Sequence, residues 1–253
     1  MPRFFALKEN IDESEGIITL IGDDAHHIAR SLRMAEGEKV TVCDGEGTEY
    51  LCRLDRIRDT ESVCTVLSSE KSLAEPPYSL LVCQALVKGD RMDTAVQKSV
   101  ESGATEVLPF VSSRCIVRMK DGKKDDDNKL RRLRRIASEA AKQCGRGRLP
   151  VVDDETDFDS MLRRAAKTEL PLFCYEDEKT RMLGTVLSDV RNSEKMPASV
   201  AVVIGAEGGF SPDEAEKAEK AGLIPVSLGR RILRTESAAA FVLACLASEF
   251  ELR

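Results

Sequence analysis

The chain has 253 residues, 42% of them hydrophobic and 32% charged, and its formal net charge is −6. This length and composition suit a soluble globular protein with one large or two modest domains. No apolar run reaches transmembrane length, and the first ten residues lack the apolar segment of a signal peptide, so we expect a cytoplasmic, membrane-free protein. The eight cysteines form no CxxC pair, so we expect reduced core thiols, with neither a disulfide nor a metal site.

Residues 1–72 are predicted to form a small, mostly β domain. Strand-like runs occur at Ile17–Leu20, Lys39–Asp44, Glu49–Ile57 and Ser62–Leu67, with one helix at Asp24–Leu32. Gly45-Glu46-Gly47 is typical of a hairpin turn. The polar, proline-bearing stretch Ser68–Pro77 is predicted to be a linker. All-β modules of this size are often barrels.

Residues 73–253 alternate between strand and helix patterns, which predicts a parallel sheet. The first unit is a strand at Leu80–Leu86, a helix around Met92–Val100 that Gly103 ends, and a strand at Glu106–Val111. Later elements are predicted at Asp159–Ala166 (helix), Leu170–Tyr175 (strand), Met182–Arg191 (helix), Val200–Ile204 (strand), Ile224–Leu228 (strand) and Ser237–Phe250 (helix).

A basic segment lies between these elements. Met119–Asn128 is a charge run predicted to be a loop, and from Lys129 to Arg148 eight basic residues face one acid, Glu139, a local charge of +7. The helix that follows the loop has an apolar face, so its arginines must crowd the other faces. Because the acids that would balance them are missing, we expect contact with an RNA backbone, the alternative being a merely solvated helix. The arginines concerned are Arg131, Arg132, Arg134, Arg135, Arg146 and Arg148.

Two glycine turns follow two strands within a short stretch near the C-terminus. Val200–Ile204 leads into Gly205-Ala206-Glu207-Gly208-Gly209, after which Ser211-Pro212-Asp213-Glu214 is typical of a helix start with a capping box. The strand Ile224–Leu228 ends at Gly229. In an open α/β sheet this arrangement indicates a binding crevice. The spacing is neither GxGxxG nor a P-loop, so a phosphate cradle and a dinucleotide oxidoreductase are disfavoured.

These two segments carry a resemblance to a known family. IGAEGGFSPDE followed by LGRRILRTESA resembles the signature of the SPOUT-class RNA methyltransferases that make 3-methyluridine in 16S ribosomal RNA. HHIARSLRM, KGDRM, QKSVESGATEVLPFVSSRC and SEAAKQCGRGRLP resemble the same family, so the resemblance covers nearly the full length. Ala206 stands where the family usually has proline and Ser237 where it usually has threonine, and both substitutes are small residues.

The resemblance implies an α/β fold with a knotted, parallel-sheet SPOUT methyltransferase domain after a PUA-like RNA-binding β-barrel. It also implies S-adenosyl-L-methionine as the cofactor, 16S ribosomal RNA or the small ribosomal subunit as the partner, and a homodimer. The apolar helix Ala238–Leu246 is the expected dimer contact, the alternative being core packing within one subunit.

Site residues are assigned on the motifs. Arg234 is expected to stabilise the uracil anion formed when N3 loses its proton, and Glu236 is a candidate base that could equally cap a helix. Arg146 is the second candidate arginine. The residues expected to hold the cofactor are Tyr175, Ile204, Gly205, Glu207, Gly208, Gly209, Leu228, Gly229, Ile232, Leu233 and Thr235. The remaining residues expected to contact RNA are Arg30, Arg33, Lys88 and Arg91.

Other interpretations stay open from the residues alone. Tyr175 begins an acidic stretch that could be an ordinary loop, and Arg30 and Arg33 could be solvated charges at a helix end. A ribose 2′-O-methyltransferase would share the fold, and a non-enzymatic RNA-binding assembly factor would share the basic segment. The paired glycine turns argue against the assembly factor.

Overall fold

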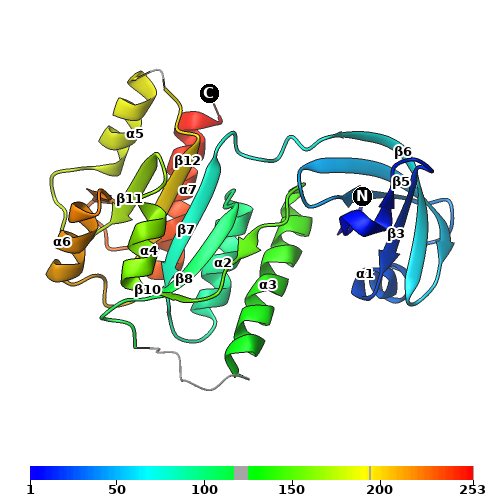
Figure 1. Cartoon of the computed structure of the whole chain (residues 1–253), viewed down its shortest axis with the longest axis horizontal. Coiled ribbons are helices and arrows are strands. Elements are labelled where there is room, and N and C mark those ends of the chain that lie inside the picture. Colours follow the sequence, from blue (N-terminus) through cyan, green and yellow to red (C-terminus); the bar gives the residue numbers. More distant parts are fainter. Residues whose placement is uncertain (117–124, 194, 253) are drawn as a thin grey trace. The chain divides into compact units, whose positions relative to one another are not determined.

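The computed structural model of the chain describes residues 1–116, 125–193 and 195–252, which divide into two compact units (Figure 1). Unit 1 consists of Met1–Glu75 together with Ala141–Leu149, and unit 2 consists of Pro76–Ala140 and Pro150–Arg253. The sequence did not predict that Ala141–Leu149 belongs with the N-terminal unit. Within the described ranges, no helix has both the length and the apolarity needed to cross a membrane.

Unit 1 is built on a six-stranded sheet in the order β1-β4-β5-β6-β3-β2. The strands are β1 (Arg3–Phe5), β2 (Ile11–Asp12), β3 (Ile17–Ile21), β4 (Lys39–Cys43), β5 (Thr48–Ile57) and β6 (Glu61–Lys71). Short helices lie at η1 (Lys8–Asn10), α1 (Asp23–His26) and η2 (His27–Ser31). Pairs are antiparallel except β1 with β4, and Phe4, Ile18, Leu20, Ile28 and Leu54 fill the core.

Strand pairing in unit 1 differs from the sequence expectation in two ways. The sheet curls, with register shifts between β5 and β6, but β1 and β2 remain its two edges, so across the fully described Met1–Lys71 the pairing does not close a barrel. Ser68–Lys71, predicted as part of a linker, extends β6, because Lys71 pairs with Thr48 across the β5–β6 hairpin. The hairpin turn predicted at Gly45-Glu46-Gly47 is confirmed between β4 and β5.

Unit 2 contains a parallel sheet in the order β10-β8-β7-β12-β11-β13, with β9 also paired to β8. Its strands are β7 (Ser79–Ala85), β8 (Glu106–Val111), β9 (Val151–Val152), β10 (Thr156–Asp157), β11 (Leu170–Cys174), β12 (Ser199–Ile204) and β13 (Ile224–Val226). Its helices are α2 (Arg91–Glu101), α4 (Phe158–Ala165), α5 (Leu183–Asn192), α6 (Pro212–Lys220) and α7 (Thr235–Phe250). The predicted parallel alternation of strand and helix is confirmed.

Helices cover the sheet because its central strands are buried along their length. The run Val200–Ile204 in β12 is at most 2% exposed. The helix α4 packs against β7, β8 and β12, while α7 packs on β12 and also contacts α2 (Figure 1). Continuously apolar strands covered by helices are what a parallel sheet requires.

The helix α3 (Asp125–Cys144) begins earlier than expected. The loop predicted at Met119–Asn128 lies partly outside the described residues, and its last part, residues 125–128, is helical. The predicted apolar face is confirmed at Leu133, Ala137 and Ala140, which are at most 8% exposed.

Candidate active site

The turn after β12 is fixed in place by the residue that ends it. Phe210 is fully buried and lies parallel to Phe110 of β8, with ring centres 6.4 Å apart, and 4.3 Å from Phe173 of β11. The next residue, Ser211, caps α6 through the predicted capping box with Glu214. An aromatic cluster on one side and a capped helix on the other therefore hold the Gly205–Gly209 turn.

Gly209 occupies a position that no other residue can take without rearrangement. Its φ is +64°, in the left-handed region, and a Cβ built on it would lie 1.7 Å from Oε1 of Glu176. Glu176 follows β11 in the next loop, so its carboxylate lies directly against the glycine backbone. The left-handed backbone favours glycine here, and a side chain at this position would displace the Glu176 carboxylate, which also lines the cavity.

A cavity of about 1100 Å³ opens beside this turn, at the edge of the sheet where the strands end. The structure brings all eleven residues predicted to hold the cofactor around this one cavity, together with Arg234 and Glu236. The loops after β11, β12 and β13 supply its walls, as expected for a ligand crevice outside the carboxyl ends of parallel strands. Contact between these residues and a cofactor stays a prediction.

Three polar groups connect the walls of the cavity, and sequence reasoning missed one of them. Thr235, the first residue of α7, donates from its hydroxyl to the carbonyl of Gly205 at 2.6 Å. The Thr235 hydroxyl oxygen in turn accepts from Nε2 of Gln84 at 2.9 Å. Gln84 is 1% exposed at the end of β7, where a buried amide within the apolar run LLVCQA is the signal that could have drawn attention to it. Thr235 therefore ties the start of α7 to the glycine turn.

Glu207 lines the cavity and pairs with Arg91, a residue that was predicted to contact RNA. Arg91 donates to Oε1 of Glu207 at 2.7 Å, and the backbone N–H of Lys88 donates to the same oxygen at 3.4 Å. Burial raises the pKa of the Glu207 carboxyl, but backbone N–H groups and Arg91 outweigh it and lower the pKa overall. Glu207 is therefore a carboxylate at neutral pH.

The two residues predicted to be catalytic lie next to each other at the start of α7. Arg234 precedes the helix and its side chain is 81% exposed, with its guanidinium 3.9 Å from the carboxylate of Glu236. The Glu236 side chain is 15% exposed and lies in the first helical turn, which fits the alternative in which it interacts with the helix N-terminus. Arg234 also lines the cavity, and its catalytic role stays a prediction.

The arginines of α3 are exposed as predicted, but the expectation that balancing acids are missing is wrong. Arg132 forms ion pairs with Asp93 and Asp90, and Arg134 donates to Asp154 at 3.0 Å. The acids come from segments distant in sequence, so a local charge count overstates the free positive charge. Among the described residues, no ion pair engages Arg135, which remains the clearest RNA-binding candidate on this helix.

Arg146, which was also predicted to contact RNA, is buried and paired with a carboxylate. It is 2% exposed, and its Nε and Nη2 donate to the carboxylate of Glu75 at 2.7–3.0 Å. The backbone N–H groups of Gly147 and Arg148 donate to the same carboxylate at 3.0 Å. Burial raises the pKa of Glu75, but these hydrogen bonds outweigh it and lower the pKa. A buried, paired guanidinium is a structural group of unit 1, so it supports neither RNA contact nor the second catalytic assignment.

The other predicted RNA contacts are exposed. Arg30 pairs with Asp59 in unit 1, Arg33 has a left-handed φ of +51°, and Lys88 lies in the loop after β7. Arg148 is also exposed and donates to the carbonyl of Glu46 at 3.1 Å. Contact between these residues and RNA stays a prediction.

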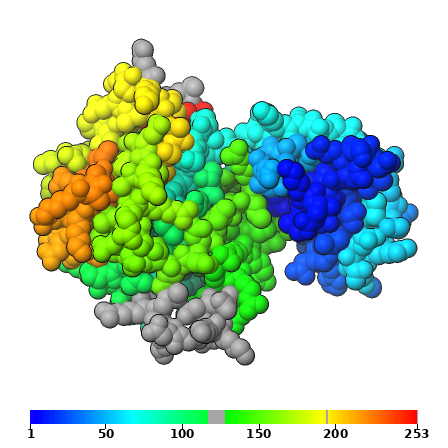
Figure 2. All heavy atoms as spheres, viewed as in Figure 1, coloured from blue at the N-terminus to red at the C-terminus, as the bar shows by residue number. Residues whose placement is uncertain are grey.

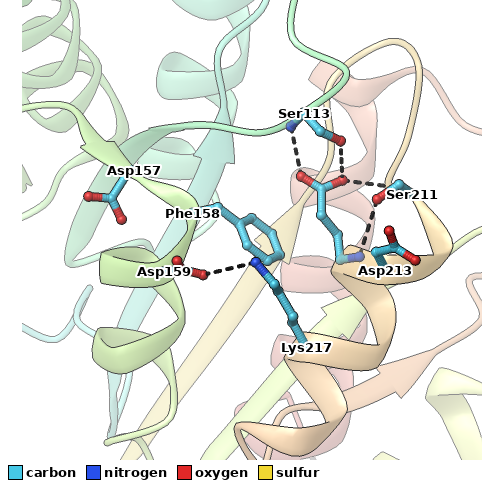
Figure 3. Close-up of a pocket in the computed structure, with 8 residues that line it drawn as sticks. Ser113, Asp157, Phe158, Asp159, Ser211, Asp213 and Lys217 are labelled. Carbon is cyan, nitrogen blue, oxygen red and sulfur yellow. Dashed lines mark hydrogen bonds and ion pairs between the residues drawn. The ribbon is translucent and has the colours of Figure 1, made fainter.

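A second cavity, of about 430 Å³, lies between α4 and α6, which are side by side in Figure 2. Its charged lining is mainly acidic, because Asp157, Asp159, Asp213 and Glu214 accompany a single cation, Lys217, which pairs with Asp159 at 3.7 Å (Figure 3). Negative charge disfavours a phosphate-bearing ligand there. In the part of the chain that the structure describes, no cluster of His, Cys, Asp or Glu residues is arranged to hold a metal ion.

Comparison with known proteins identifies the family. A family model for the RNA methyltransferase domain matches residues 74–247, and a model for the RNA methyltransferase PUA domain matches residues 20–67. The chain belongs to the RNA methyltransferase family.

Relatives and solved structures agree over the full length. The ribosomal RNA small subunit methyltransferase E of Bacillus subtilis (strain 168) is 30% identical over 254 residues, covering 100% of this chain and 98% of the relative. A ribosomal RNA small subunit methyltransferase E from Neisseria gonorrhoeae bound to S-adenosyl methionine has a TM-score of 0.82 at 29% identity. A methyltransferase from Legionella pneumophila with bound SAM has a TM-score of 0.84 at 29% identity. Each superposition covers 98% of this chain and 97% of the other.

Proposed function

We propose that this protein methylates a uridine of 16S ribosomal RNA at N3, with S-adenosyl-L-methionine as the methyl donor. The observation that carries the proposal is the convergence of both sequence motifs, through all their assigned residues, on one cavity at the carboxyl edge of the sheet. The family, the relatives named for the small ribosomal subunit and the neighbours with bound SAM support the substrate class and the cofactor.

The lining of the cavity suits an adenosine-bearing cofactor. Leu228, Leu233 and Ile204 offer apolar surface for a purine, and Gly208 and Gly229, which have no side chains of their own, let the backbone line the cavity directly. Glu207, held as a carboxylate by Arg91, supplies negative charge suited to ribose hydroxyls or a cationic ligand. When bound, this cofactor supplies an electrophilic methyl group attached to a sulfonium.

The chain must then make uracil N3 nucleophilic. For N3 to accept the methyl group that the bound cofactor would supply, its imide proton must leave, and the residues of the chain must take up that proton and stabilise the anion. Arg234 stabilises the negative charge that develops on the uracil oxygens, and Glu236 or a water molecule accepts the proton. Both groups lie at the start of α7 and line the cavity, which supports these roles.

Further parts of the proposal concern assembly. We propose a PUA-like RNA-binding domain over residues 1–72, a methyltransferase domain over residues 73–253 with a trefoil knot, a homodimer, and a cytoplasmic location. Phe241 on the apolar helix α7 is 37% exposed, which supports that helix as the dimer contact.

The test is product analysis. Unmethylated 16S ribosomal RNA or small subunits, incubated with the protein and labelled cofactor, are digested to nucleosides and analysed by mass spectrometry. We expect 3-methyluridine, and label on ribose would instead identify a 2′-O-methyltransferase. Arg234→Ala should lower single-turnover methylation by roughly a hundredfold, the scale of losing one preorganised electrostatic group. Arg163→Ala, an exposed change on α4, is the matched control.

A further inference from the structure

The turn after β8 brings another arginine to the glycine turn. Arg114 follows Ser112-Ser113, and its Nη1 donates to the carbonyl of Gly208 at 2.8 Å. A Cβ built on Gly208 would lie 3.2 Å from Cβ of Arg114, so the two segments are in close contact. The guanidinium therefore lies against a turn that lines the larger cavity.

A buried carboxylate anchors this turn. Glu214 is 6% exposed and accepts from the backbone N–H of Ser113 at 2.7 Å and from its hydroxyl at 2.8 Å. It also accepts from the backbone N–H of Ser211 at 2.9 Å, within the capping box of α6. Ser113 and Ser211, both labelled in Figure 3, thus share one carboxylate that joins the Arg114 turn to the end of the glycine turn.

The Arg114 side chain itself remains exposed. Among the described residues no carboxylate forms an ion pair with it, in contrast to Arg91, which pairs with Glu207 beside the same cavity. Its electrostatic influence extends to Tyr175, a lining residue: burial, Asp177 and Glu176 raise the pKa of Tyr175, and Arg114 opposes them. Arg114 thus presents unpaired donors beside the cavity on an anchored backbone.

We propose that Arg114 is a substrate-contacting residue that binds an anionic oxygen of the target nucleotide at the mouth of the cofactor cavity, and that Glu214, through Ser113, is its positioning residue. This inference rests on the proposed function. A preorganised guanidinium loses little side-chain freedom when it binds phosphate or a uracil oxygen, which is why an anchored, unpaired arginine suits this role.

The experiment measures single-turnover methylation and cofactor affinity for Arg114→Ala, Arg114→Lys and the control Arg163→Ala. Arg114→Ala should lower kcat/KM for RNA roughly a hundredfold, with cofactor affinity by calorimetry unchanged and only partial rescue by lysine. If the oxygen belongs to a phosphate, the loss is in KM and the salt slope becomes shallower by roughly 0.7–0.9. If the oxygen belongs to uracil, the loss is in kcat and the pH–rate profile shifts to higher pH, because the uracil anion is less stabilised.

Positioning is tested separately from folding. Ser113→Ala removes one of the hydrogen bonds to Glu214. In the parent background it should lower the methylation rate, whereas in the Arg114→Ala background it should have no further effect. A general loss of structure would instead lower the methylation rate in both backgrounds. A parent protein that forms no 3-methyluridine would refute the proposed function. A parent that forms it at the same kcat/KM as Arg114→Ala would refute only the role of Arg114.

Discussion

Replacing Arg146 by methionine tests the claim that this arginine is structural. The substitution keeps most of the side-chain volume but leaves Glu75, whose side chain is 12% exposed, without its guanidinium partner. Removing one member of a buried ion pair typically costs about 3–5 kcal/mol. The lower value, about 3 kcal/mol, is expected here, because Gly147 and Arg148 still donate backbone N–H groups to the carboxylate.

The assay is thermal unfolding of the full chain, monitored by a spectroscopic signal that reports on unit 1. For a unit of this size, about 3 kcal/mol corresponds to a decrease in Tm of about 12–24 °C. Arg148→Met, a matched change at an exposed neighbour, should shift the free energy of unfolding by no more than about 0.5 kcal/mol. Combining Arg146→Met with Glu75→Gln should recover part of the loss, because no unpaired charge is then buried.

RNA binding provides the contrast. At a temperature where both proteins are folded, Arg146→Met should leave the salt dependence of RNA affinity unchanged. A loss of stability below about 1 kcal/mol, or a salt slope shallower by roughly 0.7–0.9, would refute the structural assignment and restore Arg146 as a phosphate contact.

Three further changes test other parts of the molecule. Gly209→Ala should weaken cofactor binding in a calorimetric titration, because its Cβ would meet Glu176, whereas Gly222→Ala, with φ of +91° and open space around it, strains the backbone alone and should bind normally. Arg135→Gln should reduce the salt dependence of RNA affinity by more than Arg132→Gln does, because Arg132 is already paired with acids. Equal salt slopes for both variants and the parent would mean that α3 is only solvated. Burial and Asp153 raise the pKa of Glu106 to about 7, so the native state retains a proton that the unfolded state releases, and stability should fall as pH rises from about 4.5 to 7. Glu106→Gln should flatten that part of a pH series of urea unfolding curves, and an unaltered slope would show that the pKa of Glu106 is not raised.

Local patterns predicted most of unit 2. The continuous apolar run of β12, the capping box at Ser211 and the glycine at position 209 each report a local requirement, namely burial, a helix start and a left-handed φ. The motif residues could be grouped from the sequence because the carboxyl ends of parallel strands meet at one edge of the sheet. The residues that gather at the cavity therefore followed from the order of the elements.

Contacts between distant segments could not be predicted in this way. The charge count along α3 missed Asp93 and Asp154, and the RNA contact expected of Arg146 ignored Glu75, about seventy residues earlier in the chain. Gln84 joins the network of Thr235 only through tertiary packing. An arginine in a basic segment gives no local sign of whether a carboxylate from elsewhere holds it.

The two walls of the cavity differ in how they are supported, and this difference sets the entropy of ligand binding. The wall that ends at Phe210 is part of the aromatic core and is ordered before any ligand arrives. Another part of the lining includes Ile232, which is 91% exposed, so a ligand that covers this side chain restricts its rotamers at a cost of about 0.5–1 kcal/mol. The ligand therefore meets one wall that is already ordered and one side chain that it must order itself.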